Sequence, residues 1–227
     1  MSLIIAKNLH KSFGSEKLIV PVLHDINMRV EQDEFLGIMG KSGAGKSTLL
    51  YLLSLLDHPT KGTITVNGTD VNSLTETERT AFRLHTLGYV FQDYALVPDL
   101  TATENVLLPV LMRGEKYKEA INKSVRSLNE VGLHNKNDSL PSEMSGGEQQ
   151  RVAIARAIAD KPSILFADEP TANLDSQSGQ NIIDLLTCLN KEHKLTVVMV
   201  THEREYATNC NRILHMEDGR IVNEEFN

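Results

Sequence analysis

The sequence has no tryptophan, two cysteines and no long apolar segment. Cys188 and Cys210 have no neighbours at metal-ligand spacing, so we expect both to be small apolar fillers in a reduced, cytosolic protein. No stretch approaches the roughly 18 consecutive apolar residues of a membrane-spanning helix. The apolar run within residues 1–7 is also too short for a signal peptide. We therefore expect no direct membrane insertion.

Basic residues are in the minority. The chain has 23 Lys and Arg residues against 30 Asp and Glu residues, which gives a formal net charge of −7. Nucleic-acid scaffolds usually carry a basic excess or stripe, so we expect no nucleic-acid partner. The chain has 227 residues, of which 41% are hydrophobic, and this is enough for a substantial core in a single α/β domain.

What the sequence does contain is a complete phosphate-binding motif, G-x-x-x-x-G-K-S, at residues 40–47. An apolar run at 35–39 precedes it and a helix-like stretch at 48–56 follows, which is the strand–loop–helix setting that the motif requires. Its glycines let backbone N–H groups converge on phosphate oxygens, so the motif predicts binding of a nucleoside triphosphate. The residues expected to contact the nucleotide are Gly40, Lys41, Ser42, Gly43, Ala44, Gly45, Lys46, Ser47 and Thr48.

A second segment predicts metal binding and hydrolysis. The apolar run 164–167 ends in Asp168 and Glu169, which is the pattern of a Walker B strand. Asp168 would hold Mg²⁺ together with the Ser47 hydroxyl, and Glu169 is placed to polarise the attacking water. Lys46 would reach the β- and γ-phosphates of the nucleotide. The alternative, two solvated acids at the end of a strand, is disfavoured by the complete phosphate-binding motif.

The hydrophobic pattern predicts an α/β fold with three parts. The first third reads as an antiparallel sheet, with strands at 3–9, 18–30 and 63–66 and a hairpin turn at 67–68. Continuous apolar runs suit strands of a parallel sheet that is covered on both faces, and they lie at 87–91, 164–167 and 195–200. Helix-period patterns predict a helical insertion between two sheet strands, and they lie at 105–112, 116–131 and 147–160.

A second glycine motif, residues 145–149, opens one of the helical stretches. Ser145 as N-cap and Glu148 at the third helical position would form a capping box, which is a structural reading. The N-terminus of a helix is also an anion site. The chain already has one complete phosphate-binding site. The second anion site would be explained if it acted on the phosphate-binding site of another copy of the chain.

Together these segments resemble the ATP-binding cassette (ABC) ATPase family over nearly the whole chain. Residues 145–151 resemble its signature motif, and residues 172–175 resemble its D-loop. Gln92 follows a strand as the Q-loop glutamine does, and His202 follows a strand as the switch histidine does. Phe13 lies where the family has an aromatic residue against adenine, although it could instead fill a small core.

The resemblance implies a P-loop NTPase (RecA-like) core and a homodimer that sandwiches two ATP molecules. The single domain, 1–227, would consist of a nucleotide-binding core with an antiparallel β part, 1–92 and 161–227, and a helical signature-motif subdomain, 93–160. One subunit would use Glu169, His202 and Lys46 in catalysis and would bind Mg²⁺ through Ser47, Gln92 and Asp168. The other would add Ser145, Gly146 and Gly147, and Asp175 is also expected to bind the nucleotide.

Within the family, the chain is most similar to the macrolide-exporter, lipoprotein-release and cell-division group, on the basis of residues 91–96, 145–151 and 167–171. The resemblance implies a separate transmembrane permease, docked near residues 93–111 at the cytoplasmic face of the inner membrane. The residues expected in that docking surface are Tyr94, Leu96, Val97 and Leu100. A transporter ATPase and a permease-linked mechanical or regulatory ATPase that moves no substrate both stay open from sequence.

Overall fold

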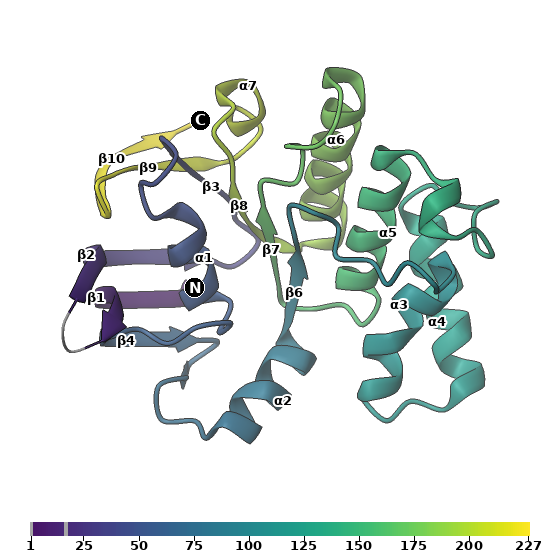
Figure 1. Cartoon of the computed structure of the whole chain (residues 1–227), viewed down its shortest axis with the longest axis horizontal. Helices are drawn as coiled ribbons and strands as arrows, with labels where there is room; N and C mark the ends of the chain where they lie inside the picture. Colours follow the sequence, from purple (N-terminus) through teal and green to yellow (C-terminus); the bar gives the residue numbers. More distant parts are fainter. Residues whose placement is uncertain (1, 16–17) are drawn as a thin grey trace.

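The computed structural model describes residues 2–15 and 18–227, which form two β-sheets and a group of helices (Figure 1). The first sheet has four strands in the order β2-β1-β4-β5, and its paired strands are antiparallel. These strands are β1 (Ser2–Ser15), β2 (Leu18–Glu31), β4 (Lys61–Val66) and β5 (Thr69–Asp70). Asn67 and Gly68, both with positive φ, form the turn between β4 and β5, which confirms the predicted hairpin.

The second sheet has six strands in the order β10-β9-β3-β8-β7-β6. Its neighbouring strands are parallel except β9 and β10. The strands are β3 (Phe35–Gly40), β6 (Leu87–Val90), β7 (Ile164–Asp168), β8 (Thr196–Val200), β9 (Arg212–Glu217) and β10 (Arg220–Phe226). Every residue of β7 and β8 is buried, as their continuous apolar runs predict.

Helices cover the parallel sheet on both faces. They are α1 (Lys46–Leu53), α2 (Glu76–Thr86), α3 (Ala102–Met112), α4 (Tyr117–Glu130), α5 (Gly146–Ile158), α6 (Ser176–His193) and the short α7 (Arg204–Ala207). Figure 1 shows α1 beside the antiparallel sheet, whereas α3, α4 and α5 lie together at the opposite end of the molecule. The expected fold class, with its antiparallel part, parallel sheet and helical part, is confirmed.

Alternate residues of each buried strand enter two hydrophobic clusters. Phe166 and Val198 pack on the face that α1 and the antiparallel sheet cover. Leu165 and Val197 pack on the other face, in a cluster that runs through α5 and α6 into α3 and α4. Because this second cluster joins the helices to the sheet, the division of the chain at residues 93 and 160 stays a prediction.

Some elements differ from the sequence-based expectations. Helix α2 lies between the predicted turn at 67–68 and the predicted strand at 87–91, where the sequence predicts no element, because few of its residues are apolar. Helix α1 spans Lys46–Leu53 rather than 48–56. Cys210 is a buried filler as expected, but Cys188 is exposed, so the expectation is wrong for that residue.

Candidate nucleotide-binding site

The phosphate-binding motif forms the loop between β3 and α1. Gly45 caps the helix with φ of 93°, a left-handed conformation that glycine adopts without strain. A Cβ on Gly40 would lie 2.3 Å from the carbonyl oxygen of Met216, so β9 approaches the loop too closely for any other residue. The loop borders an open pocket of about 710 Å³, which is lined by Met39, Gly40, Lys41, Ser42, Lys46, Glu169, His202, Arg204 and His215.

Lys46 is buried at the base of this pocket. Its ammonium group donates a hydrogen bond to the backbone carbonyl of Lys41, with Nζ 3.1 Å from the oxygen. The same Nζ lies 3.8 Å from Oε1 of Glu169. The cation is therefore held inside the loop, where a phosphate oxygen could replace the Lys41 carbonyl as its partner.

Asp168 lies at the carboxyl end of β7, beside the glycine loop. Its Oδ1 accepts a hydrogen bond from the Ser47 hydroxyl at 3.0 Å, and its Oδ2 accepts one from the Tyr89 hydroxyl at 3.4 Å. Burial raises the pKa of the Asp168 carboxyl, and the negative charge of Glu169 adds to the effect, although the Ser47 hydrogen bond opposes it. The carboxylate thus carries an electrostatic cost that a nearby cation would relieve.

The donors at this point fit Mg²⁺, which prefers oxygen ligands and is usually held by one or two carboxylates, waters and substrate phosphates. Ser47 and Asp168 present a hydroxyl and a carboxylate side by side. Within residues 2–15 and 18–227 there is no group of three His, Cys, Asp or Glu residues that could hold a metal by itself. Water or phosphate oxygens of a nucleotide could fill the other positions around a cation held by Ser47 and Asp168.

Glu169 and His202 meet above the loop. Glu169 follows β7 with φ of 44°, and its backbone N–H donates to the carbonyl of Val200 at the end of β8. This turn brings Oε2 of Glu169 to 3.0 Å from Nδ1 of His202. Since β3, β8 and β7 are neighbours in one parallel sheet, their carboxyl ends gather the loop, the histidine and both acids at one edge.

The remaining predicted residues lie outside this pocket. Ser145 caps α5 by accepting a hydrogen bond from the N–H of Glu148 at 3.3 Å, which confirms the capping box. Asp175 caps α6 in the same way through the N–H of Ser178. Gln92 is exposed just beyond β6. Phe13 is 46% exposed on β1 beneath the ammonium group of Lys11, so it does not fill a core.

Several residues at the site were not predicted. Tyr89 contacts Asp168 from β6, while Arg204 and His215 line the pocket. His215 is there because β9 runs parallel to β3, which places it beside Met39. Strand order brings Tyr89 and His215 to the site, whereas Arg204 begins α7 two residues after His202.

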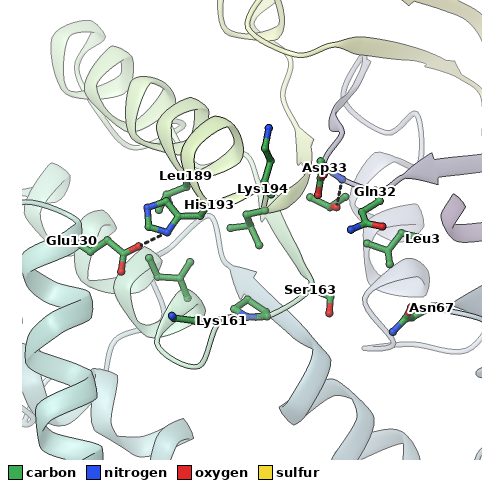
Figure 2. Close-up of a pocket in the computed structure, with 14 residues that line it drawn as sticks. Leu3, Gln32, Asp33, Asn67, Glu130, Lys161, Ser163, Leu189, His193 and Lys194 are labelled. Carbon is green, nitrogen blue, oxygen red and sulfur yellow. Dashed lines mark hydrogen bonds and ion pairs between the residues drawn. The ribbon is translucent and has the colours of Figure 1, made fainter. Parts of the chain in front are cut away.

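A second cavity, of about 480 Å³, lies at the amino ends of β7 and β8 (Figure 2). Figure 2 shows the ion pair between His193 and Glu130 at one end and Gln32 and Asn67 at the other. None of the predicted nucleotide-binding residues lines it. Because ligands of parallel sheets bind beyond the carboxyl ends of the strands, the pocket at the glycine loop is the candidate nucleotide site.

Comparison with known proteins agrees with this geometry. Residues 23–172 match the family described as ABC transporter. The chain is 49% identical over 203 residues to the lipoprotein-releasing system ATP-binding protein LolD of Aquifex aeolicus (strain VF5), covering 89% of this chain and 90% of that protein. It is 44% identical over 207 residues to the macrolide export ATP-binding/permease protein MacB of Rhodopirellula baltica (strain DSM 10527 / NCIMB 13988 / SH1), covering 90% of this chain but only 30% of that protein.

A solved structure is similar over almost the whole fold. It is the dimeric, post-hydrolysis state of the ATP-binding cassette MJ0796 bound to ADP and Pi, with a TM-score of 0.91, 39% sequence identity and 98% of each chain covered. The fold and the site define an ATP-binding, ATP-hydrolysing cassette. The chain belongs to the ABC transporter family. Among the residues that the structure describes, no helix is long and apolar enough to cross a membrane.

Proposed function

We propose that two copies of this chain sandwich ATP and power a separate membrane permease of the exporter or substrate-extraction type, at the cytoplasmic face of the inner membrane. One observation carries the proposal. The glycine loop, Lys46 and Glu169 line one pocket, and Asp168 is hydrogen-bonded to Ser47 of the same loop, whereas the second glycine motif begins α5, outside that pocket. Support comes from the dimeric cassette at 39% identity and from LolD and MacB, whose names place them in release and export systems.

Within one subunit, Lys46 would neutralise phosphate charge, and Ser47, Asp168 and Gln92 would hold Mg²⁺. When bound, the cation would offset charge on the phosphate oxygens. Glu169 would accept a proton from the attacking water. His202 lies 3.0 Å from the Glu169 carboxylate and would orient that carboxylate. Phe13 would stack on adenine.

The partner subunit would close the site. The N-terminal end of α5, with Ser145, Gly146 and Gly147, presents backbone N–H groups and a positive helix end that suit a terminal phosphate. Asp175, at the start of α6, would lie at the same interface. Phosphoryl transfer depends mainly on positioning and charge neutralisation, so closure of the dimer would complete both.

Mixing two inactive variants tests whether the subunits complete each other. Lys46→Ala removes the loop cation but keeps α5, whereas Gly147→Asp keeps the loop and places a carboxylate against the partner's phosphate. A Cβ on Gly147 meets only Ser178, at 3.4 Å or more, so the variant should fold. We expect each variant alone to release little phosphate, and the equimolar mixture to regain about a quarter of the wild-type rate if dimers form at random.

Each variant alone should stay inactive at every protein concentration used for the mixture. Failure of the mixture to exceed the sum of its components would contradict completion between subunits. Dilution of the mixture provides the matched control, because the regained rate should fall faster than protein concentration if the active species is a mixed dimer.

A shallow groove offers a place for the permease. It has a volume of about 220 Å³ between β6, α3 and α5, and Leu84, Pro109 and Met112 contribute to its lining. Leu108 and Met112 are 43% and 71% exposed there. Of the residues expected in the docking surface, Leu96 packs against the core, whereas Val97 is 40% exposed. We therefore place the docking surface at Leu108, inside the predicted segment 93–111, and at Met112, the residue just after it.

Charged substitutions in the groove should release the chain from membranes. We expect Leu108→Asp with Met112→Asp to move most of the chain from the sedimented membranes of its source cells into the supernatant, because docking would bury a charge. ATP affinity should not change. Val222→Asp, at a residue 57% exposed on β10, is the matched control. Equal membrane retention of both variants would place the docking surface elsewhere.

A further inference from the structure

A turn just after Gln92 is anchored by the helix that carries the second glycine motif. Tyr94 and Ala95 both have positive φ, 61° and 49°, which non-glycine residues rarely adopt. The guanidinium of Arg156 on α5 donates to both of their carbonyls, at 2.8 Å to Tyr94 and 2.5 Å to Ala95. Partial burial lowers the pKa of Arg156, and the two carbonyls offset the cost of desolvating this cation. The turn is therefore attached to α5.

The same turn also reaches the segment that precedes α6. The side-chain amide of Asn173 donates to the carbonyl of Gln92 at 3.0 Å. In return, the Tyr94 hydroxyl donates to the carbonyl of Asn173 at 3.4 Å. Two hydrogen bonds of opposite direction thus join residues 92–94 to Asn173, two residues before Asp175.

The Tyr94 hydroxyl lies against the second glycine motif as well. A Cβ on Gly146 would stand 2.8 Å from this oxygen and 3.2 Å from Cδ2 of Leu174. Tyr94 and the segment before α6 therefore occupy the space beside the first residue of α5. Tyr94, which belongs to the turn after Gln92, thus lies against two segments that are distant in sequence: the one at Asn173 and the start of α5.

We infer that Tyr94 and Asn173 are positioning residues that couple the start of α5 to Gln92 and to the segment of Asp175, so that the partner-facing elements of one subunit move together when its own nucleotide is bound. The inference rests on the proposed dimer. Neither residue lines the nucleotide pocket, so their loss should leave ATP binding by the single subunit intact. Loss of either residue should weaken only the binding of the α5 N-terminus to the partner subunit.

The test uses full-length chains that carry Glu169→Gln to slow hydrolysis. We compare this parent with versions that also carry Tyr94→Phe, which removes only the hydroxyl, or Asn173→Ala. Sedimentation velocity with MgATP over a protein dilution series gives the dimer dissociation constant. Fluorescence titration with a labelled ATP analogue, at protein concentrations where every version is monomeric, gives nucleotide affinity. Thermal melting without nucleotide reports the stability of the fold.

We expect the dimer dissociation constant to rise by at least about fivefold in each variant, a typical coupling between sites, with nucleotide affinity and melting temperature unchanged. Tyr117→Phe, at an exposed residue of α4, is the matched control and should behave like the parent. The inference is overturned if Tyr94→Phe and Asn173→Ala dimerise as well as the parent does, or if they lose nucleotide affinity to the same extent. A parent that stays monomeric refutes the proposed dimer itself.

Discussion

Lys46→Ala should abolish ATP binding. The Lys46 ammonium is buried beneath the glycine loop and is held there by the Lys41 carbonyl. A charge-assisted hydrogen bond is worth about 1.5–3 kcal/mol, and Lys46 would make more than one with the phosphates. Because about 1.4 kcal/mol corresponds to a tenfold change, we expect affinity to fall by at least about 100-fold. Isothermal titration calorimetry with ATP measures this directly.

Two checks accompany the calorimetry. Lys118→Ala removes an equally charged side chain from the exposed face of α4 and should bind ATP like the wild type. Circular dichroism should show that Lys46→Ala retains its helices and strands. A folded Lys46→Ala chain with wild-type affinity would remove this residue from the phosphate site.

Glu169→Gln should retain ATP binding but lose nearly all turnover. Glutamine keeps the size of the side chain between Lys46 and His202, yet it cannot accept a proton from water. General-base catalysis contributes about 10²- to 10⁴-fold, so phosphate release should fall by that factor. Loss of a negative charge beside the terminal phosphate also favours closure around ATP. The variant should therefore run as a dimer in size-exclusion chromatography with MgATP.

Size-exclusion chromatography also tests whether the dimer depends on the cation. Addition of EDTA should dissociate the dimer, because it would remove the proposed cation from Ser47 and Asp168. Glu119→Gln, an exposed change on α4, should hydrolyse ATP at the wild-type rate and elute as the wild type does. Wild-type turnover by Glu169→Gln would exclude Glu169 as the base. A monomeric Glu169→Gln chain saturated with MgATP would exclude the sandwich.

Local sequence predicted the parts of the site that depend on local geometry. The glycine loop needs backbone conformations and close approaches that few residues allow, so its spacing is informative by itself. The buried strands β7 and β8 are short and continuously apolar, so Asp168, Glu169 and His202 could be placed at their ends. Their meeting at one edge follows from the parallel order of β3, β8 and β7.

Other features depend on long-range packing or on weaker signals. Helix α2 is mostly polar, and its sequence signals are a capping box between Thr75 and Glu78 and a few apolar residues on one face. Tyr89 and His215 reach the site through the neighbours of their strands, which the sequence does not reveal. The interactions of Tyr94 depend on a turn with two left-handed residues that no turn motif predicts.

The internal partner of Lys46 has a practical consequence. A buried ammonium group without an acceptor would destabilise the fold of the nucleotide-free protein. Here the Lys41 carbonyl and the nearby Glu169 carboxylate satisfy the cation from within the chain. The polypeptide should therefore be obtainable in a nucleotide-free form, which lets binding titrations start from an empty protein.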